Sequence, residues 1–182
     1  MKITFIAAVG IIPFISLSCQ KDIASAVNNN STVVVSNVTA PVTVVTFNQL
    51  IPLQIIVPRQ RGIIFSDSIY VSDDEAILKG LRFEVKGVNL SFTDYIILIN
   101  GIKVGASGNF EAGILTITPN KPVSLLINNY YQLEVITKVN APQQVFNVQL
   151  SSNNVSISNY YYNHPAIING LPCSYSIAVR KA

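Results

Sequence analysis

Apolar and polar side chains alternate along much of the chain after residue 42. In the segment 81–86, Leu81, Phe83 and Val85 alternate with an arginine, a glutamate and a lysine. A period of two places these sets on opposite faces of a β-strand, one against a core and one in water. We therefore predict a half-buried strand here, and similar strands at residues 131–139, 146–150, 155–157 and 175–179.

Two further segments are apolar on both faces. Residues 95–99 and 114–117 contain few polar side chains. Continuous apolar character over so short a length is typical of strands that lie deep between two sheets. We expect both segments to contribute to the centre of the core.

Turn-forming residues separate these segments. Asn100-Gly101 tolerates the positive φ angles of a type I′ turn and so predicts a hairpin. No segment has the period and caps of an amphipathic helix, and residues 73–76 would form one turn at most. Short strands joined by turns predict an all-β sandwich. Glycine, proline, asparagine and serine predict breaks at residues 79–80, 86–87, 105–108, 119–122, 128–129, 140–142 and 151–154.

Residues 74–85, 97–105 and 113–117 resemble the immunoglobulin-like sandwich modules of large bacterial surface proteins. The resemblance covers roughly residues 43–158 and rests on the strand pattern rather than on an invariant motif. It implies an immunoglobulin-like antiparallel β-sandwich, which we expect to form a single domain over residues 41–182. Such modules act as spacers, adhesive units or accessory domains.

Composition narrows the class of protein further. Of the 182 residues, 49% are hydrophobic and 12% are charged, which excludes a disordered chain. A net charge of +3 without a cluster of cations argues against nucleic acid as a partner.

Residues 1–18 contain one lysine, an apolar run and small residues at its end. They predict a secretory signal peptide, and we predict no transmembrane helix after it.

The end of this segment, Ser16-Leu17-Ser18-Cys19, is similar to the lipobox of bacterial lipoproteins. The aliphatic residue stands two places before Cys19, whereas the commoner motif has it three places before. The following Gln20-Lys21-Asp22 resembles the export tag of Bacteroidetes surface lipoproteins. The resemblance implies a lipid on Cys19 and an outer-membrane location facing the exterior. Residues 19–40 would then be the lipidated terminus and a flexible tether.

The chain contains few residues suited to catalysis. His164 is its one histidine, no Gly-x-Ser-x-Gly motif occurs, and Cys173 has no neighbouring base apart from His164 nine positions earlier. We expect a surface histidine in a turn and an inert, half-buried thiol near the last strand. The chain is therefore predicted to be a non-enzyme without a cofactor.

Four acidic residues fall within nine positions: Asp67, Asp73, Asp74 and Glu75. Carboxylates gathered on a loop hold Ca²⁺ in some proteins, but the Asp-x-Asp-x-Asp-Gly spacing is missing here. Adjacent carboxylates also commonly end a strand in solvent. We predict no metal site, and leave calcium at residues 73–75 as an open alternative.

Tyrosines are the best candidates for binding. Tyr160, Tyr161 and Tyr162 are consecutive and are followed by His164, so at least one phenol of a strand there must face outward. Exposed tyrosine suits protein or glycan recognition, while the alternative is that these rings cap the core. Tyr130-Tyr131 is a second pair.

A modification motif lies at Asp67-Ser68-Ile69. It resembles the O-glycosylation acceptor of secreted Bacteroidetes proteins, which implies a glycan on Ser68.

These features together predict a surface-exposed lipoprotein that acts as a non-catalytic interaction or adhesion module. Its expected partners are the membrane, through the lipid, and a protein or glycan at the cell surface. The alternative is a glycan-binding accessory lipoprotein of a surface polysaccharide uptake system. The absence of tryptophan counts against that alternative, because sugar subsites are commonly lined by its ring.

Overall fold

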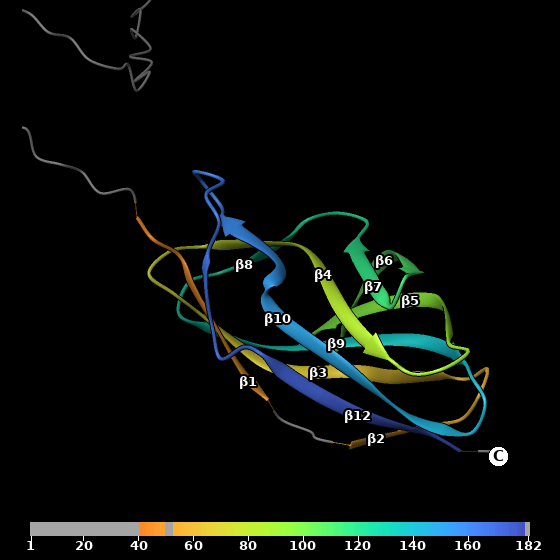
Figure 1. The fold of residues 1–182 in the computed structure, drawn as a ribbon. Helices are drawn as coiled ribbons and strands as arrows, with labels where there is room; N and C mark the ends of the chain where they lie inside the picture. Colours follow the sequence, from red (N-terminus) through yellow and green to blue (C-terminus); the bar gives the residue numbers. More distant parts are fainter. Residues whose placement is uncertain (1–40, 50–52, 181–182) are drawn as a thin grey trace, which may run out of the picture. The chain divides into compact units, whose positions relative to one another are not determined.

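The computed structural model of the protein describes residues 41–49 and 53–180. The predicted signal peptide, Cys19, the segment 20–22, the tether and residues 181–182 lie outside them. The described residues contain strands and no helix (Figure 1). The strands are β1 (Val44–Gln49), β2 (Leu53–Ile56), β3 (Arg61–Ser72), β4 (Ala76–Lys86), β5 (Ser91–Ile99), β6 (Ile102–Glu111), β7 (Ile114–Pro119), β8 (Val123–Leu125), β9 (Asn129–Asn140), β10 (Gln144–Asn159), β11 (Ile167–Asn169) and β12 (Cys173–Val179).

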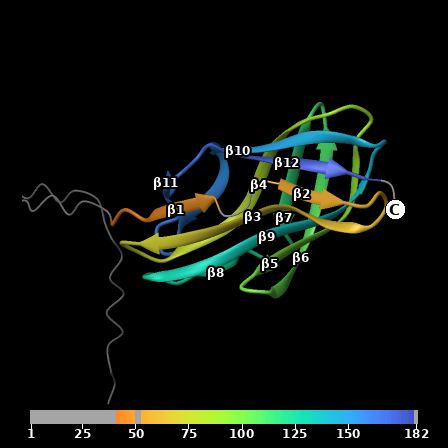
Figure 2. The same ribbon diagram turned by 90° about the horizontal axis from the view of Figure 1, so that it is seen from below.

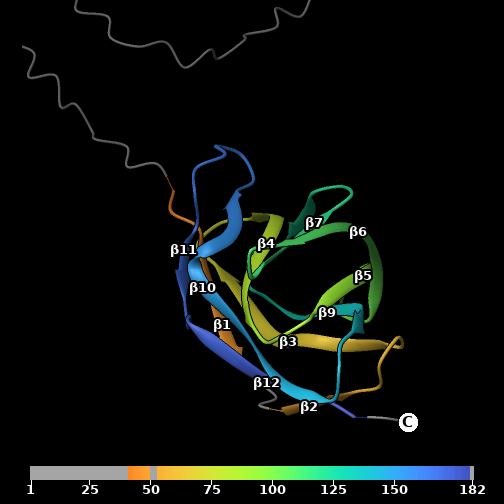
Figure 3. The ribbon, with the colours of Figure 1, turned by 45° about the vertical axis from the view of Figure 1, so that its right-hand side comes forward.

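The strands form one curled sheet whose two halves face each other. One half has the order β11-β1-β3-β9-β5, the other β7-β4-β10-β12-β2, and β6 joins them by pairing with β5 and β7. Figure 3 shows β6 carrying the sheet round from one half to the other. β8 pairs with the beginning of β4, outside this order. The predicted all-β, immunoglobulin-like sandwich is confirmed.

Two pairs of strands depart from the antiparallel arrangement. β1 is parallel to β11, and β2 is parallel to β12, while the other ladders are antiparallel. β1 and β2 follow one another along the chain (Figure 2), but β1 pairs with β3 in one half and β2 with β12 in the other. The first two strands therefore contact the last two, one pair in each half. None of the described residues forms a helix long and apolar enough to span a bilayer.

The core lies between the two halves and follows the predicted alternation. In β4, Leu81, Phe83 and Val85 are buried, and Arg82 on the opposite face is exposed. Aromatic rings join the halves: the Phe65 ring centroid lies 5.3 Å from that of Phe83 and 5.2 Å from that of Tyr175. Edge and tilted contacts at these distances add to the free energy of burial.

The predicted hairpin at Asn100-Gly101 is confirmed. Asn100 has a φ of 50° and Gly101 a φ of 76°, and β5 and β6 pair directly at either side, Ile99 with Ile102. Positive φ at both central residues is what a type I′ turn requires. The turn thus fixes the register at the junction of the two halves.

Three predicted breaks are wrong. β4 continues through residues 79–80, β6 through 105–108 and β10 through 151–154. In β10 the ladder to β4 shifts register between Leu150 and Val155, so the polar residues bulge out of the sheet without ending the strand. A β-bulge absorbs extra residues in this way and also bends the strand.

Candidate functional site

The three consecutive tyrosines lie on the link between β10 and β11, here called the tyrosine loop (residues 160–164), which projects beyond the end of β10 in Figure 1. Tyr160, Tyr161 and Tyr162 are 45%, 63% and 53% exposed. The expected strand alternation fails here because β10 ends at Asn159 and the chain turns. A turn points successive side chains outward, so all three phenols are on the surface.

A buried asparagine holds the beginning of this loop. Asn159 is 1% exposed, and its Oδ1 accepts hydrogen bonds from the backbone N–H groups of Tyr161 and Tyr162, both at 2.8 Å. Its Nδ2 donates to Thr43 Oγ1 at 2.8 Å and to Asp74 Oδ2 at 2.7 Å. The amide thus makes the four hydrogen bonds that its side chain can make. It ties the loop to the beginning of the domain and to the β3–β4 turn.

The tyrosines also contact that turn and one another. Glu75 accepts a hydrogen bond from the Tyr160 backbone N–H at 2.9 Å and one from the Tyr161 hydroxyl at 3.4 Å. The negative charge of Glu75 raises the pKa of the Tyr161 phenol. The Tyr160 and Tyr161 rings meet edge to face at 5.0 Å, and the His164 ring stacks on Tyr162 at 6.4 Å. His164 is exposed, as predicted for a turn.

The second tyrosine pair divides between surface and interior. Tyr130 is 68% exposed and packs on the ring of Tyr70 at a centroid distance of 4.5 Å. Tyr131 is partly buried, and its hydroxyl accepts a hydrogen bond from the backbone N–H of Leu126 at 2.6 Å. Only Tyr130 of this pair is therefore freely presented to solvent.

The four acidic residues do not form one group. Asp67 is buried in the core row of β3, whereas Asp73, Asp74 and Glu75 lie in the β3–β4 turn. Each of the turn carboxylates accepts a hydrogen bond from the protein. Within the part of the chain that the structure describes, no three histidine, cysteine, aspartate or glutamate side chains are placed to share a metal ion.

Ser68 and Cys173 both lie within strands. Ser68 is half-buried in β3, paired with Asn48 of β1 on one side and Gln132 of β9 on the other. Its glycosylation stays a prediction. Cys173 begins β12 and is 3% exposed, so the expected half-buried thiol is fully buried instead. Burial raises its pKa to about 11, which keeps the thiol protonated and unreactive at neutral pH.

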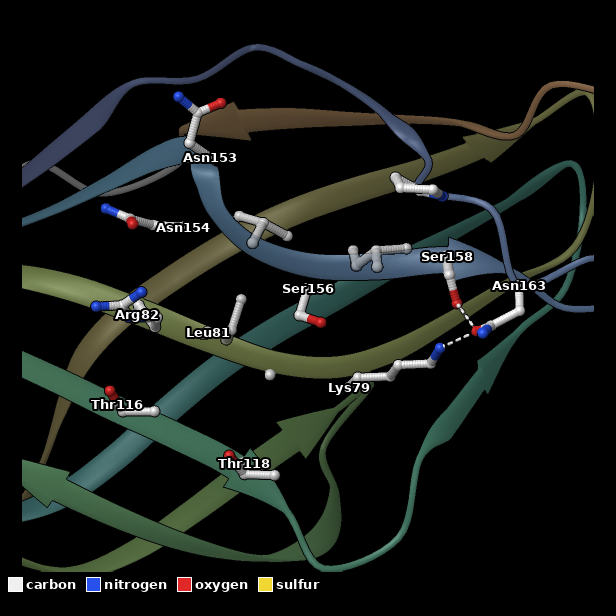
Figure 4. A pocket seen from close by; sticks show the side chains of 14 residues that line it. Lys79, Leu81, Arg82, Thr116, Thr118, Asn153, Asn154, Ser156, Ser158 and Asn163 are labelled. Carbon is white, nitrogen blue, oxygen red and sulfur yellow. Dashed lines mark hydrogen bonds between the residues drawn. The ribbon is translucent and has the colours of Figure 1, made fainter.

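Beside the tyrosine loop lies a hollow of about 520 Å³, here called the groove (Figure 4). Its walls come from β4, β7, β10 and the tyrosine loop. Of its fourteen lining residues, Gly80, Leu81, Val155, Ile157 and Pro165 are apolar, and the other nine carry amides, hydroxyls or positive charge: Lys79, Arg82, Thr116, Thr118, Asn153, Asn154, Ser156, Ser158 and Asn163.

Asn163 connects the groove to the loop. Lys79 Nζ donates a hydrogen bond to Asn163 Oδ1, and Ser158 Oγ donates to the same oxygen at 3.4 Å (Figure 4). Asn163 has a φ of 56°, a left-handed conformation that asparagine tolerates better than most residues. The tyrosine loop and the groove therefore adjoin each other at Asn163.

The sequence pattern did not point to the groove. Residues 79–80 and 151–154 look like turns because glycine and consecutive polar residues interrupt the alternation there. Both are bulges within long strands. The sequence signals each by a change of phase, since buried apolar residues stand at even-numbered positions before it and at odd-numbered positions after it.

Comparisons with known proteins give no family. No protein-family model and no curated protein matches the chain. Among solved structures, similar ones include a cohesin module from a family 33 glycoside hydrolase of Clostridium perfringens, with 8% identity, a TM-score of 0.42, and coverage of 79% of this chain and 100% of that one. A non-cellulosomal cohesin of Archaeoglobus fulgidus has 11% identity, a TM-score of 0.42, and coverage of 75% and 91%. CaCohA2 of Clostridium acetobutylicum has 12% identity, a TM-score of 0.41, and coverage of 75% and 90%. TM-scores below 0.5 at this identity establish neither a family nor a partner for the chain.

Proposed function

We propose that the protein is a non-catalytic interaction or adhesion module that contacts a protein partner through the tyrosine loop. The observation that carries this proposal is the group of three exposed tyrosines on a loop held by the buried side chain of Asn159. Tyrosine provides a large contact area and a hydrogen-bonding hydroxyl for little loss of side-chain entropy.

The hydrogen bonds that hold the loop favour a role in binding, as opposed to tyrosines that merely lie on the surface. Binding costs free energy whenever a loop must be ordered, so a loop already fixed by hydrogen bonds binds more tightly for the same contacts. The Asn159 amide and the backbone bonds from Tyr160 N–H to Glu75 O and from Asn159 N–H to His164 O hold this loop at both ends.

The tyrosine loop is tested by placing the photo-crosslinking residue p-benzoylphenylalanine at Tyr162 in the full chain, in intact cells. We expect a discrete, light-dependent protein adduct. Adding Tyr161→Ala should reduce its yield at least tenfold, because a central interface tyrosine commonly contributes about 2 kcal/mol or more. The matched control is Tyr130→Ala, which removes an exposed tyrosine elsewhere and should leave the yield unchanged.

Absence of any adduct at position 162, or an equal loss with Tyr130→Ala, would contradict a protein partner at the loop. An adduct in which the crosslinked partner is a carbohydrate and not a second protein would favour the glycan-binding alternative instead.

The second part of the proposal is that a lipid on Cys19 holds the module at the outer membrane, facing the exterior. It is supported by the apolar segment 1–18, the lipobox-like sequence around Cys19 and the charged segment Gln20-Lys21-Asp22. Several acyl chains together make such an anchor stable, since each buried CH₂ contributes about 0.8 kcal/mol.

Metabolic labelling with an alkyne palmitate tests the anchor. We expect label on the wild-type protein and none on Cys19→Ser, which should also leave the membrane fraction. Cys173→Ser is the matched control and should keep the label, because that thiol is buried in the fold. Protease treatment of intact cells then tests exposure to the exterior. A soluble, unlabelled wild-type protein would overturn this part of the proposal.

A further inference from the structure

The β4–β10 ladder has gaps at two cationic residues. Along β4, each residue from Ala76 to Lys86 has a partner in β10 except Lys79 and Arg82. The first gap lies at the register shift between Ser156 and Ile157, and the second at the bulge between Leu150 and Val155. Both irregularities of the β4–β10 ladder therefore leave a positively charged residue of β4 without a strand neighbour on that side.

The same irregularities open the groove over these two residues. The bulge carries Asn153 and Asn154 to one side, and Thr116 and Thr118 of β7 lie on the other side (Figure 4). Gly80 lies between the two cations and has no side chain to fill the space. A Cβ there would meet only Ile117 O at 3.4 Å and Thr118 Oγ1 at 3.7 Å. A hollow of about 520 Å³ is within the size range of small-ligand sites.

The charged side chains that line the groove are both positive. Among its lining residues the charged ones are Lys79 and Arg82, and within residues 41–49 and 53–180 neither forms an ion pair. Lys79 bonds to the neutral amide of Asn163, which leaves its charge uncompensated. The carboxylates nearby are Glu84, which accepts a bond from Asn154 at 3.5 Å, and Glu111, which shares a smaller hollow with Arg82. Neither of them lines the groove.

Seven of the other lining residues have amide or hydroxyl side chains, which suit the hydroxyl groups of a sugar. Amide and hydroxyl side chains both donate and accept hydrogen bonds, as sugar hydroxyls require. A guanidinium binds a carboxylate through two parallel, charge-assisted hydrogen bonds, which are stronger than the bonds that the hydroxyl groups of a neutral sugar accept. Positive charge and a lining of amides and hydroxyls together select a ligand that is both anionic and polyhydroxylated.

We propose that the groove binds an acidic oligosaccharide, with the carboxylate of one uronic acid at Arg82, that of another at Lys79, and the sugar hydroxyls at the asparagines and threonines. This site is separate from the protein contact proposed for the tyrosine loop, and either one stands without the other. The exposed guanidinium of Arg82 sets the preference for the acid, and Gly80 provides the room.

Isothermal titration of the purified full chain with trigalacturonate tests the site, with neutral galactotriose as the uncharged comparison. We expect binding of the acidic trisaccharide that weakens with added salt, and at least tenfold weaker binding of the neutral one. Arg82→Gln should reduce affinity for trigalacturonate at least tenfold, and Gly80→Val should reduce it as strongly by filling the groove.

Two control variants distinguish the groove from general surface charge and from the tyrosine loop. Lys86→Gln removes an exposed cation from the same strand outside the groove and should leave affinity unchanged. Tyr161→Ala should also leave it unchanged, because that ring does not line the groove. No binding of trigalacturonate, equal binding of the neutral sugar, or an equal effect of Lys86→Gln would overturn the proposal. Since Arg82 is exposed, its variant tests the site even if Gly80→Val fails to fold.

Discussion

Asp67 is a carboxyl group in a row of apolar core residues. It lies between Phe65 and Ile69 on the inner face of β3 and is 0% exposed. The Tyr175 hydroxyl contacts its Oδ2 at 3.3 Å, and its Oδ1 has no hydrogen-bond partner. Burial raises the pKa of Asp67, although hydrogen bonds from the backbones of Ser68 and Asn48 and from Tyr175 oppose the rise. An unpaired buried acceptor typically costs about 1–3 kcal/mol.

This residue makes stability depend on pH in an unusual direction. Because the folded-state pKa is raised, the folded chain holds the proton more tightly than the unfolded chain does. The contribution of Asp67 to stability is therefore complete below its unfolded-state pKa and is lost as the pH rises through the folded-state value. As the pH rises from acid to neutral, we expect the free energy of unfolding of Asp67→Asn to increase by about 1 kcal/mol or more relative to that of wild type. Urea unfolding at a series of pH values measures this difference.

Asp94 is the matched control because its pKa moves the other way. The hydrogen bond and positive charge of Lys138, 3.0 Å away, lower the pKa of Asp94 on the surface. Its contribution is present above the unfolded-state pKa and is lost as the pH falls. Asp94→Asn should therefore lose stability relative to wild type at neutral pH. A constant difference between Asp67→Asn and wild type at all pH values would contradict the account of Asp67.

At the scale of the element, two glycines have the same backbone conformation in different surroundings. Gly101 in the β5–β6 turn has a φ of 76°, and Gly170 after β11 has a φ of 79°. A Cβ on Gly101 would have no atom within 4 Å, whereas a Cβ on Gly170 would lie 1.9 Å from the carbonyl oxygen of Phe47 in β1. Both positions require a left-handed backbone, but only one is also a close approach of two chain segments.

Alanine substitutions at these two positions distinguish the cost of a left-handed backbone from the cost of a steric clash. Gly101→Ala should lower the free energy of unfolding by about 1 kcal/mol, the cost of a left-handed alanine. Gly170→Ala should cost at least twice as much, because the added methyl group must displace β1 from β11. Thermal unfolding of the two variants measures the difference. Equal losses would show that the contact between Gly170 and Phe47 is not tight.

How far the sequence predicts an element depends on whether its pattern is local. The alternation at residues 81–86 and the turn at Asn100-Gly101 are local, and both are confirmed. Asp67 groups with acidic loop residues in the sequence because a carboxylate normally marks the wet face, and only the alignment with Phe65 and Ile69 indicates the core. The bulge at residues 151–154 escapes prediction because polar residues in mid-strand look like a turn.

At the scale of the whole molecule, the sequence predicts the sandwich but not how its strands are distributed between the two halves. Nothing in the apolar pattern assigns β1 and β2 to different halves or makes them parallel to β11 and β12. The run of consecutive tyrosines is enough to predict that some of them are exposed. The groove depends on the register between β4 and β10, which are distant in the sequence. Only the assembled fold brings Lys79 and Arg82 into one groove with Asn153 and Asn154.

The parallel pairing of β2 with β12 determines how the domain resists mechanical force. Leu53 pairs with Ser176 and Ile56 with Val179, so the strands point the same way. A force that pulls the N-terminal side of β2 and the C-terminal side of β12 apart acts along the strands. It shears the hydrogen bonds of this ladder together, whereas an antiparallel pair pulled from one end would open bond by bond. Because β1 and β11 are parallel as well, we expect tension along the strands to load the hydrogen bonds of this second ladder together too.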